Sequence, residues 1–138
     1  MQTDLARILS VSGQHGLFSF VASARNGVIA ENLETKKRTV FSGQSRITSL
    51  GDIAIYTSET EMKLAEVFLA LKGVLKDNAA PSPKAPESEL VALFKEAVPD
   101  YDEDRFHVSH MRKVVDWYDQ IDKYASFDFV KDDEQEEA

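Results

Sequence analysis

The sequence predicts an α+β protein, in which an N-terminal SH3-like small antiparallel β-barrel with a covering helix precedes an α-helical hairpin domain. Up to Tyr56, short segments of alternating apolar and polar residues are joined by tight turns, as in small antiparallel barrels. From Ser58 onwards, the apolar residues recur with the 3.6-residue period of a helix instead of at every second position. A proline-rich segment, residues 77–86, separates the first part of the chain from the second.

The charge of the chain changes at this proline-rich segment. Residues 1–76 contain nine Lys/Arg and seven Asp/Glu, whereas residues 77–138 contain seven and seventeen, so the net charges are +2 and −10. We therefore predict a β-barrel-like domain at 1–76 and a helical domain at 87–125, joined by a linker at 77–86. The acidic tail, 126–138, is predicted to be disordered because it has too few apolar residues to pack.

The N-terminal domain is predicted to contain one short helix and four strands. Thr3 is placed to cap a helix that runs through Leu9. Asn26-Gly27 stands between two apolar runs and indicates a type I′ hairpin, because both central residues of that turn need positive φ. Ile47 and Leu50 are expected to be buried in a short turn or a single helical turn. The predicted strands span residues 17–23, 28–33, 38–41 and 53–56.

Three further helices are predicted after the strands. Ser58 and Glu61 have the spacing of a capping box, which begins an amphipathic helix at residues 59–76. The apolar stripe of this helix must be buried, and we expect it to cover the sheet. The two helices of the hairpin follow, one at 87–98 and one that begins after Ser109 as its cap.

The composition excludes several classes of function. The chain has no cysteine, which removes disulfides, thiolate nucleophiles and cysteine-based zinc sites and is typical of a cytoplasmic protein. It has no apolar run long enough to span a membrane and no signal-peptide pattern. It also lacks a nucleophile elbow and a glycine-rich phosphate loop. We therefore predict a cytoplasmic protein that is not an enzyme, needs no cofactor or metal, and acts by binding a protein partner.

A group of basic residues in the turns of the β-domain is the candidate binding patch. If the turns gather at one end of the sheet, these cations form a positive surface near exposed aromatic rings, as in small barrels that bind single-stranded RNA. Nucleic-acid binding is therefore the alternative function, although the net charge of −8 disfavours it. The same patch could instead receive the acidic half of this chain, and the oligomeric state stays open. The patch comprises Arg25, Lys36, Lys37, Arg38 and Arg46.

The segment between the last two helices carries two weak metal-site patterns. Asp100, Asp102 and Asp104 alternate like the first ligands of a calcium-binding loop. That loop also needs glycine at its sixth position and glutamate at its twelfth, where this chain has Arg105 and Met111. A solvated acidic loop is therefore the favoured interpretation.

The second pattern is a pair of histidines, His107 and His110. Their spacing would point both rings the same way within one helix. Because Ser109 is the predicted cap, the pair spans the start of the helix and need not converge on a metal with Asp104.

An apolar island, Phe127–Val130, interrupts the acidic tail. It has the character of a segment that docks in a groove or adds a strand to the sheet of a partner. We favour the other interpretation, in which it folds back and covers the last helix through Trp117 and Tyr124, because a small helical unit needs its apolar contacts.

Several short stretches of the chain resemble a family of small uncharacterised bacterial proteins. In the first unit they are Leu9-Ser10-Val11-Ser12-Gly13, Gly16-Leu17-Phe18, Arg25-Asn26-Gly27, Arg46-Ile47 and Asp52–Thr57. In the second unit they are Leu93-Phe94-Lys95, Pro99–Asp102, Arg105, Val108-Ser109 and Trp117-Tyr118. The resemblance spans nearly all of residues 4–124 and implies an N-terminal small β-domain followed by a helical domain. It implies no activity, so it transfers no catalytic residue.

Overall fold

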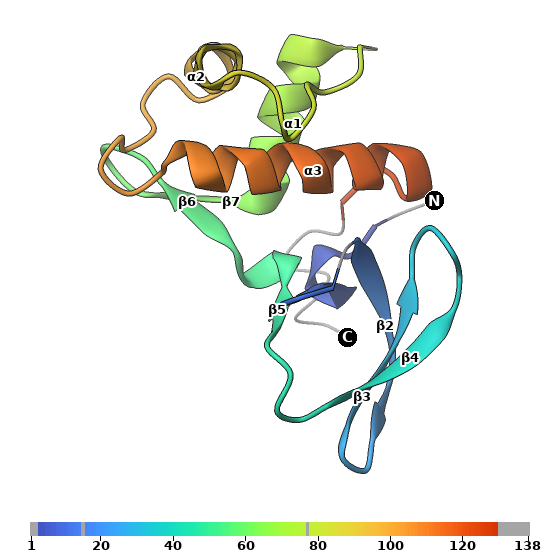
Figure 1. Cartoon of the computed structure of the whole chain (residues 1–138). Coiled ribbons are helices and arrows are strands. Elements are labelled where there is room, and N and C mark those ends of the chain that lie inside the picture. The colour runs from blue at the N-terminus through green and yellow to red at the C-terminus, as the bar shows by residue number, and fades with distance from the viewer. Residues whose placement is uncertain (1–2, 15, 77, 130–138) are drawn as a thin grey trace. The chain divides into compact units, whose positions relative to one another are not determined.

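A computed structural model describes residues 3–14, 16–76 and 78–129 (Figure 1). The protein is α+β, as predicted, and it divides into two compact units. Unit 1 consists of residues 1–53 together with the segment from Gln120 to the end of the chain, and unit 2 consists of residues 54–119. The chain passes between the units after Ile53 and again after Asp119, and the predicted linker, 77–86, lies within the residue range of unit 2.

Unit 1 contains a five-stranded antiparallel sheet with the strand order β4-β3-β2-β1-β5. The strands β4 and β5 are its two edges, so the strands do not form a closed barrel. The register of β2 against β3 shifts between Phe20 and Ala22, and such a bulge increases the local twist of a sheet. The strands are β1 (Ile8–Val11), β2 (Leu17–Ala24), β3 (Gly27–Asn32), β4 (Arg38–Ser42) and β5 (Ile47–Ser49).

One buried cluster of unit 1 lies on one face of this sheet. The Phe18 and Phe41 rings meet edge to face, with their centroids 5.0 Å apart. Leu9, Val11 and Ala30 complete the buried cluster. Phe18, Ala30 and Phe41 lie on three neighbouring strands, so the alternation of residues along each strand brings their side chains to the same face.

The hairpin predicted at Asn26-Gly27 is present, but its turn is not type I′. Ala24 pairs with Gly27 across the strands, so Arg25 and Asn26 form the turn, and neither Asn26 nor Gly27 has positive φ. Glycine is needed at position 27 for a different reason. A Cβ atom there would overlap the carbonyl group of Phe41 in the neighbouring strand.

The expected N-terminal helix is much shorter than predicted. It is a single 3-10 turn, η1 (Leu5–Arg7), whose backbone is capped by Asp4 rather than Thr3. Ile8 and Leu9 belong to β1, which lies between β2 and β5. Three of the four residues of β1 are buried, and an apolar segment this short does not show whether it is a strand or part of a helix.

The prediction for the segment after β4 is confirmed for Leu50 and wrong for Ile47. Ile47 lies in the edge strand β5, and Leu50 begins a second 3-10 turn, η2 (Leu50–Asp52). The hydroxyl of Ser49 donates to the carbonyl of Ala6 at 2.8 Å, which joins η2 to η1. This strand was missed because its three residues are too few to show an alternating pattern.

Gln120 closes the end of β2 with its side chain. Its Oε1 accepts a hydrogen bond from the buried backbone N–H of Leu17 at 2.7 Å. Gln120 itself is 9% exposed. A buried backbone N–H without an acceptor destabilises the fold. The Gln120 side chain supplies the acceptor for the Leu17 N–H in place of a neighbouring strand.

We expect Gln120→Ala to lower the free energy of unfolding by about 1–3 kcal/mol, because it leaves the Leu17 N–H buried without an acceptor. Urea denaturation measures the change. The control is Gln44→Ala in the exposed turn after β4, which should shift stability by less than about 0.5 kcal/mol. Equal effects of the two substitutions would contradict this role of Gln120.

The start of the predicted disordered tail is ordered. Phe129 forms a parallel bridge with Thr3, whose N–H donates to the carbonyl of Asp128 at 2.7 Å. The Thr3 and Ser126 hydroxyls lie 2.9 Å apart. The apolar island therefore folds back onto the N-terminal segment of its own chain, up to Phe129. The rest of the predicted tail lies outside the described residues.

Unit 2 begins with a two-stranded hairpin, β6 (Ala54–Tyr56) and β7 (Glu61–Lys63). The capping box predicted at Ser58 and Glu61 is absent, because Thr57 and Thr60 close a tight turn there. The Thr57 hydroxyl donates to the Thr60 carbonyl at 2.8 Å and accepts from the Thr60 N–H at 3.1 Å. Helix α1 therefore starts later, at Leu64–Leu75, where Glu66 accepts from the N–H of Lys63 at 3.3 Å.

Three helices supply the core of unit 2. They are α1, α2 (Glu87–Ala97) and the part of α3 (Val108–Tyr124) that ends at Asp119. α1 packs along α2, and its Phe68 ring meets the Tyr118 ring of α3 with the centroids 6.1 Å apart. The apolar stripe of α1 is therefore buried against other helices, whereas the sequence predicted that it covers the sheet.

The proline-rich segment is partly bound to α3. One guanidinium nitrogen of Arg112 donates to the carbonyls of Pro83 and Ala85, at 2.7 and 2.9 Å. Ala85 is buried, and Pro86 directly precedes α2. These contacts make residues 83–86 part of unit 2.

Candidate functional site

The candidate site of unit 2 lies where the β6–β7 turn meets the segment before α3. Thr57 forms an antiparallel bridge with Tyr101. On either side of it, the Asp102 N–H donates to the carbonyl of Tyr56 and the Ser58 N–H to that of Asp100, both at 2.8 Å. These backbone bonds hold the acidic segment beside the hairpin, as a further strand would lie.

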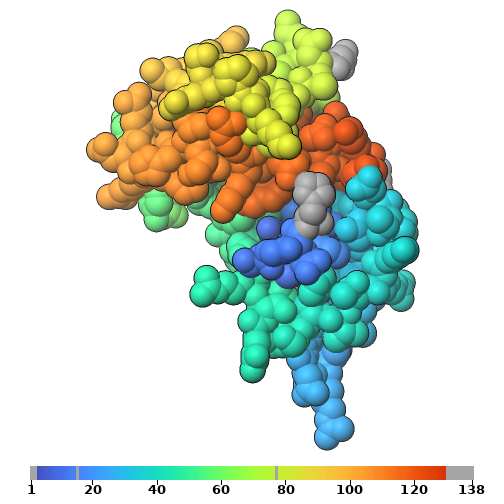
Figure 2. Space-filling model, viewed as in Figure 1, coloured from blue at the N-terminus to red at the C-terminus, as the bar shows by residue number. Residues whose placement is uncertain are grey.

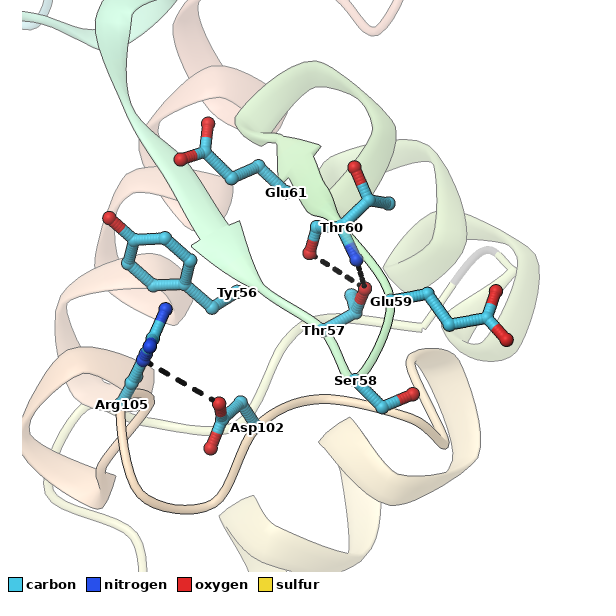
Figure 3. A pocket seen from close by; sticks show the side chains of 8 residues that line it. All are labelled: Tyr56, Thr57, Ser58, Glu59, Thr60, Glu61, Asp102 and Arg105. Carbon is cyan, nitrogen blue, oxygen red and sulfur yellow. Dashed lines mark hydrogen bonds and ion pairs between the residues drawn. The ribbon is translucent and has the colours of Figure 1, made fainter.

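An open pocket of about 400 Å³ lies between these two segments (Figure 3). The hairpin supplies most of its wall, and the segment before α3 supplies Asp102 and Arg105. The lining residues are Tyr56, Thr57, Ser58, Glu59, Thr60, Glu61, Asp102 and Arg105.

Tyr56 and Arg105 form the most distinctive contact of this pocket. The Arg105 guanidinium lies over the Tyr56 ring, 4.8 Å from its centroid, and its Nε is 3.7 Å from Asp102 Oδ2. Tyr56 is 40% exposed, although aromatic side chains usually contribute to a core. The other oxygen of Asp102 accepts from the Asp104 N–H at 2.9 Å, which fixes the turn that carries Arg105.

The pocket carries more negative than positive charge. Glu59, Glu61 and Asp102 supply three carboxylates, and Arg105 is the one cation among the lining residues. Asp102 is engaged by Arg105 and by its own turn, whereas both glutamates are exposed to solvent. An exposed aromatic ring beside exposed carboxylates is suited to a cationic group.

A second pocket of about 470 Å³ lies nearby in unit 2. Its floor is formed by the buried residues Tyr101, Phe106 and Met111, and its rim carries Glu87 and Glu103. Phe106 contacts the rings of Tyr101 and Phe94, so this floor is part of the helical core.

The residues of the predicted basic patch do not gather at one end of the sheet. Arg25 lies in the β2–β3 turn, whose tip projects from the surface in pale blue (Figure 2). Lys36 and Lys37 lie in the β3–β4 turn at the other end, and Arg38 begins β4. Arg46 precedes β5, at the opposite edge of the sheet. All five are exposed, and three of them are consecutive.

The two metal-site patterns also have structural explanations. Asp102 and Asp104 stabilise a turn through the bond described above, and the His110 Nδ1 accepts from the His107 N–H at 3.0 Å. Helix α3 begins at Val108, so Ser109 lies within its first turn. Within residues 3–14, 16–76 and 78–129, no group of three or more His, Cys, Asp or Glu side chains is placed to hold a metal ion.

Sequence reasoning did not identify Tyr56 or Arg105 as site residues. The sequence did contain one indication that Tyr56 is exposed. Side chains point alternately to the two faces of a strand, so the burial of Ile55 leaves its neighbour Tyr56 on the exposed face. In the sequence, Arg105 stands out only because it occupies the position where a calcium-binding loop needs glycine. Its approach to Tyr56 depends on backbone pairing between distant segments, for which the sequence has no local signal.

Two family models match the chain, and both describe domains of unknown function. DUF5606 matches residues 5–50, and DUF6852 matches residues 53–121. The junction of the two matches coincides with the boundary between the two units.

One solved structure is similar over most of the chain. It is a solution NMR structure of a protein from Bacteroides vulgatus, with 37% sequence identity and a TM-score of 0.69. The similarity covers 85% of this chain and 84% of that one. No match was found among curated proteins. In the described part of the chain, no helix is both long and apolar enough to cross a membrane.

Proposed function

The chain belongs to an uncharacterised bacterial family of domains of unknown function, DUF6852, and we propose that it is a non-enzymatic protein-binding module of the cytoplasm. In this proposal, the pocket between the β6–β7 turn and the segment before α3 receives a basic side chain of a partner protein. The exposed Tyr56 ring, with Arg105 over it in a pocket of net negative charge, is the observation that carries the proposal.

The charge of the pocket favours a cationic group. Three carboxylates against one guanidinium attract a lysine or arginine and repel an acidic side chain. Arg105 is an example of a guanidinium held in this way, with its Cζ 4.8 Å from the centroid of the Tyr56 ring and its Nε 3.7 Å from Asp102 Oδ2. Glu59 and Glu61 are the exposed acceptors that a second cation would meet.

The residue types favour a protein partner. Tyrosine and arginine are enriched among the residues that contribute most to binding energy at protein interfaces. Ligand pockets for small molecules are instead lined mostly by apolar side chains and enclose most of the ligand, whereas this pocket is open and mainly polar.

We expect a blocked Gly-Arg-Gly peptide to bind the full-length protein weakly, with a dissociation constant on the order of 1 mM. Backbone amide NMR signals measure the binding, and those of Tyr56 to Glu61 should shift. Tyr56→Ala should weaken binding about tenfold, because it removes the aromatic surface. Joint Glu59→Gln and Glu61→Gln substitution should weaken it several-fold and reduce its dependence on salt.

Two controls make this experiment specific. Leu69→Ala changes another exposed apolar residue of the same unit, 50% exposed, and should leave binding unchanged. The citrulline analogue of the peptide has nearly the same shape without the charge and should bind much more weakly. Equal binding of the two peptides would contradict the proposal.

We also propose that the sheet of unit 1 is a partly open, SH3-like barrel. The strand order β4-β3-β2-β1-β5 and the bulge in β2 support this description, because a bulge promotes curling of a sheet. RNA binding by the predicted patch remains the alternative function. It is supported by the three consecutive exposed cations at the β3–β4 turn.

A further inference from the structure

Among residues 3–14, 16–76 and 78–129, no strand pairs with the outer edge of β4. β4 is an edge strand of the five-stranded sheet, and four of its five residues are exposed. An edge strand of this kind is a template to which another extended segment can add.

The register of β3 and β4 shows which backbone groups face outwards. At the two ends of this ladder, the Asn32 N–H donates to the Lys37 carbonyl at 2.9 Å and the Gly43 N–H to the Asn26 carbonyl at 2.8 Å. Along an antiparallel ladder, every second residue pair is hydrogen-bonded. Between the two end pairs, the hydrogen-bonded pairs are therefore Ala30 with Thr39 and Val28 with Phe41. The N–H and C=O groups of Arg38 and Val40, and the N–H of Ser42, therefore face the free edge.

The side chains beside these groups specify the chemistry of a partner. Val40 is 62% exposed and lies on the opposite face of the strand from the buried Phe41. Arg38 lies on the same face as Val40, and Lys36 and Lys37 precede it in the turn. Glu31 neutralises part of this charge, with Arg38 Nε 3.4 Å from its Oε1.

We propose that the β4 edge binds an extended acidic segment of a partner protein, which adds to the sheet as a sixth strand. The backbone groups of Arg38 and Val40 bond to the added strand. An apolar side chain of that strand packs against Val40, and acidic side chains lie beside Arg38 and Lys37. This site is in unit 1 and is independent of the Tyr56 pocket.

The charges favour this partner over a second copy of the chain. Each copy carries Lys36, Lys37 and Arg38 beside its β4 edge, so the β4 edges of two copies repel each other. Cations beside an edge strand usually prevent pairing between identical edges. The same cations attract an acidic strand, because cross-strand pairs of opposite charge stabilise a sheet.

A short peptide of alternating glutamate and valine, added to the full-length protein, tests this proposal. We expect the Arg38, Val40 and Ser42 amides to become protected from hydrogen exchange, as strand addition requires, whereas the amides of the other edge strand, β5, stay unchanged. Joint Lys36→Gln and Lys37→Gln substitution should weaken binding several-fold and reduce its salt dependence. The matched control Arg46→Gln, an exposed cation beside β5, should have no effect.

Val40→Pro tests the backbone contact. Proline removes the outward N–H and does not remove a bond to β3, so the fold is expected to persist while binding weakens about tenfold. A dispersed amide spectrum checks the fold. If this variant unfolds, the lysine substitutions and the pattern of amide protection still decide the proposal.

Four results would overturn the proposal. An alternating lysine–valine peptide could bind as well as the acidic one, or the acidic peptide could protect β5 instead of β4. The protein without peptide could form a dimer that protects the same amides, so that a second copy would be the occupant. Finally, a single-stranded oligouridine could bind at Lys36 and Lys37 more tightly than the peptide, which would make RNA the ligand.

Discussion

Phe68→Ala is expected to lower the free energy of unfolding by about 3–5 kcal/mol. Phe68 is 0% exposed in unit 2, and its ring meets the Tyr118 ring edge to face. The substitution removes an aromatic side chain from close packing and leaves a cavity between α1 and α3. Urea denaturation, followed by circular dichroism, measures the loss.

The neighbouring residue provides a matched control. Leu69 lies on the same helix but is 50% exposed, so Leu69→Ala should change the free energy of unfolding by less than about 1 kcal/mol. If the two alanine substitutions had similar effects, the apolar stripe of α1 would not face the helical core, and this description of unit 2 would be wrong.

Gly27→Ala is expected to destabilise the protein by at least about 2 kcal/mol. The added methyl group would overlap the Phe41 carbonyl, and it would also lie 2.8 Å from the Phe41 carbonyl carbon. The backbone of β4 cannot move away without loss of its hydrogen bonds to β3. The expected result is a lower denaturation midpoint together with faster exchange of the Thr39 and Phe41 amides.

Alanine substitution at Gly73 should change the stability of the protein in the opposite direction. Gly73 lies within α1, and a Cβ atom built there has no neighbour within 4 Å. Gly73→Ala should therefore stabilise the helix by about 0.5–1 kcal/mol, because alanine loses less backbone freedom on folding. If Gly27→Ala were also neutral or stabilising, the close approach of β3 and β4 would be refuted.

The two proposed binding sites differ in the charge that they select. The β4 edge is flanked by Lys36, Lys37 and Arg38, whereas the Tyr56 pocket has three carboxylates against one guanidinium. The first suits an acidic extended segment and the second a basic side chain. If both proposals hold, the protein would connect partners of unlike charge, as a scaffold does.

The sites were only partly predictable from the sequence. The basic residues at the β3–β4 turn were identified, because turn residues are recognisable from the flanking strands. The sequence did not predict that these residues lie far from Arg25 and Arg46, because the positions of the turns depend on which strands pair. The contact of Tyr56 with Arg105 joins residues far apart in the chain, and no local pattern encodes it.

The sequence by itself determined the α+β class, the strands β2, β3, β4 and β6, and the presence of the helices α1, α2 and α3, although α1 begins at Leu64 instead of residue 59 and Ser109 does not cap α3. These elements have strong local periodicity, which is set by contacts between near neighbours in the chain. Only the tertiary structure decided that Ile8–Val11 is a strand between β2 and β5, that α1 packs with α2 and α3, and that the chain divides into units after Ile53 and after Asp119. Each of these depends on which apolar surfaces are buried together, and burial is a property of the whole fold rather than of a local segment.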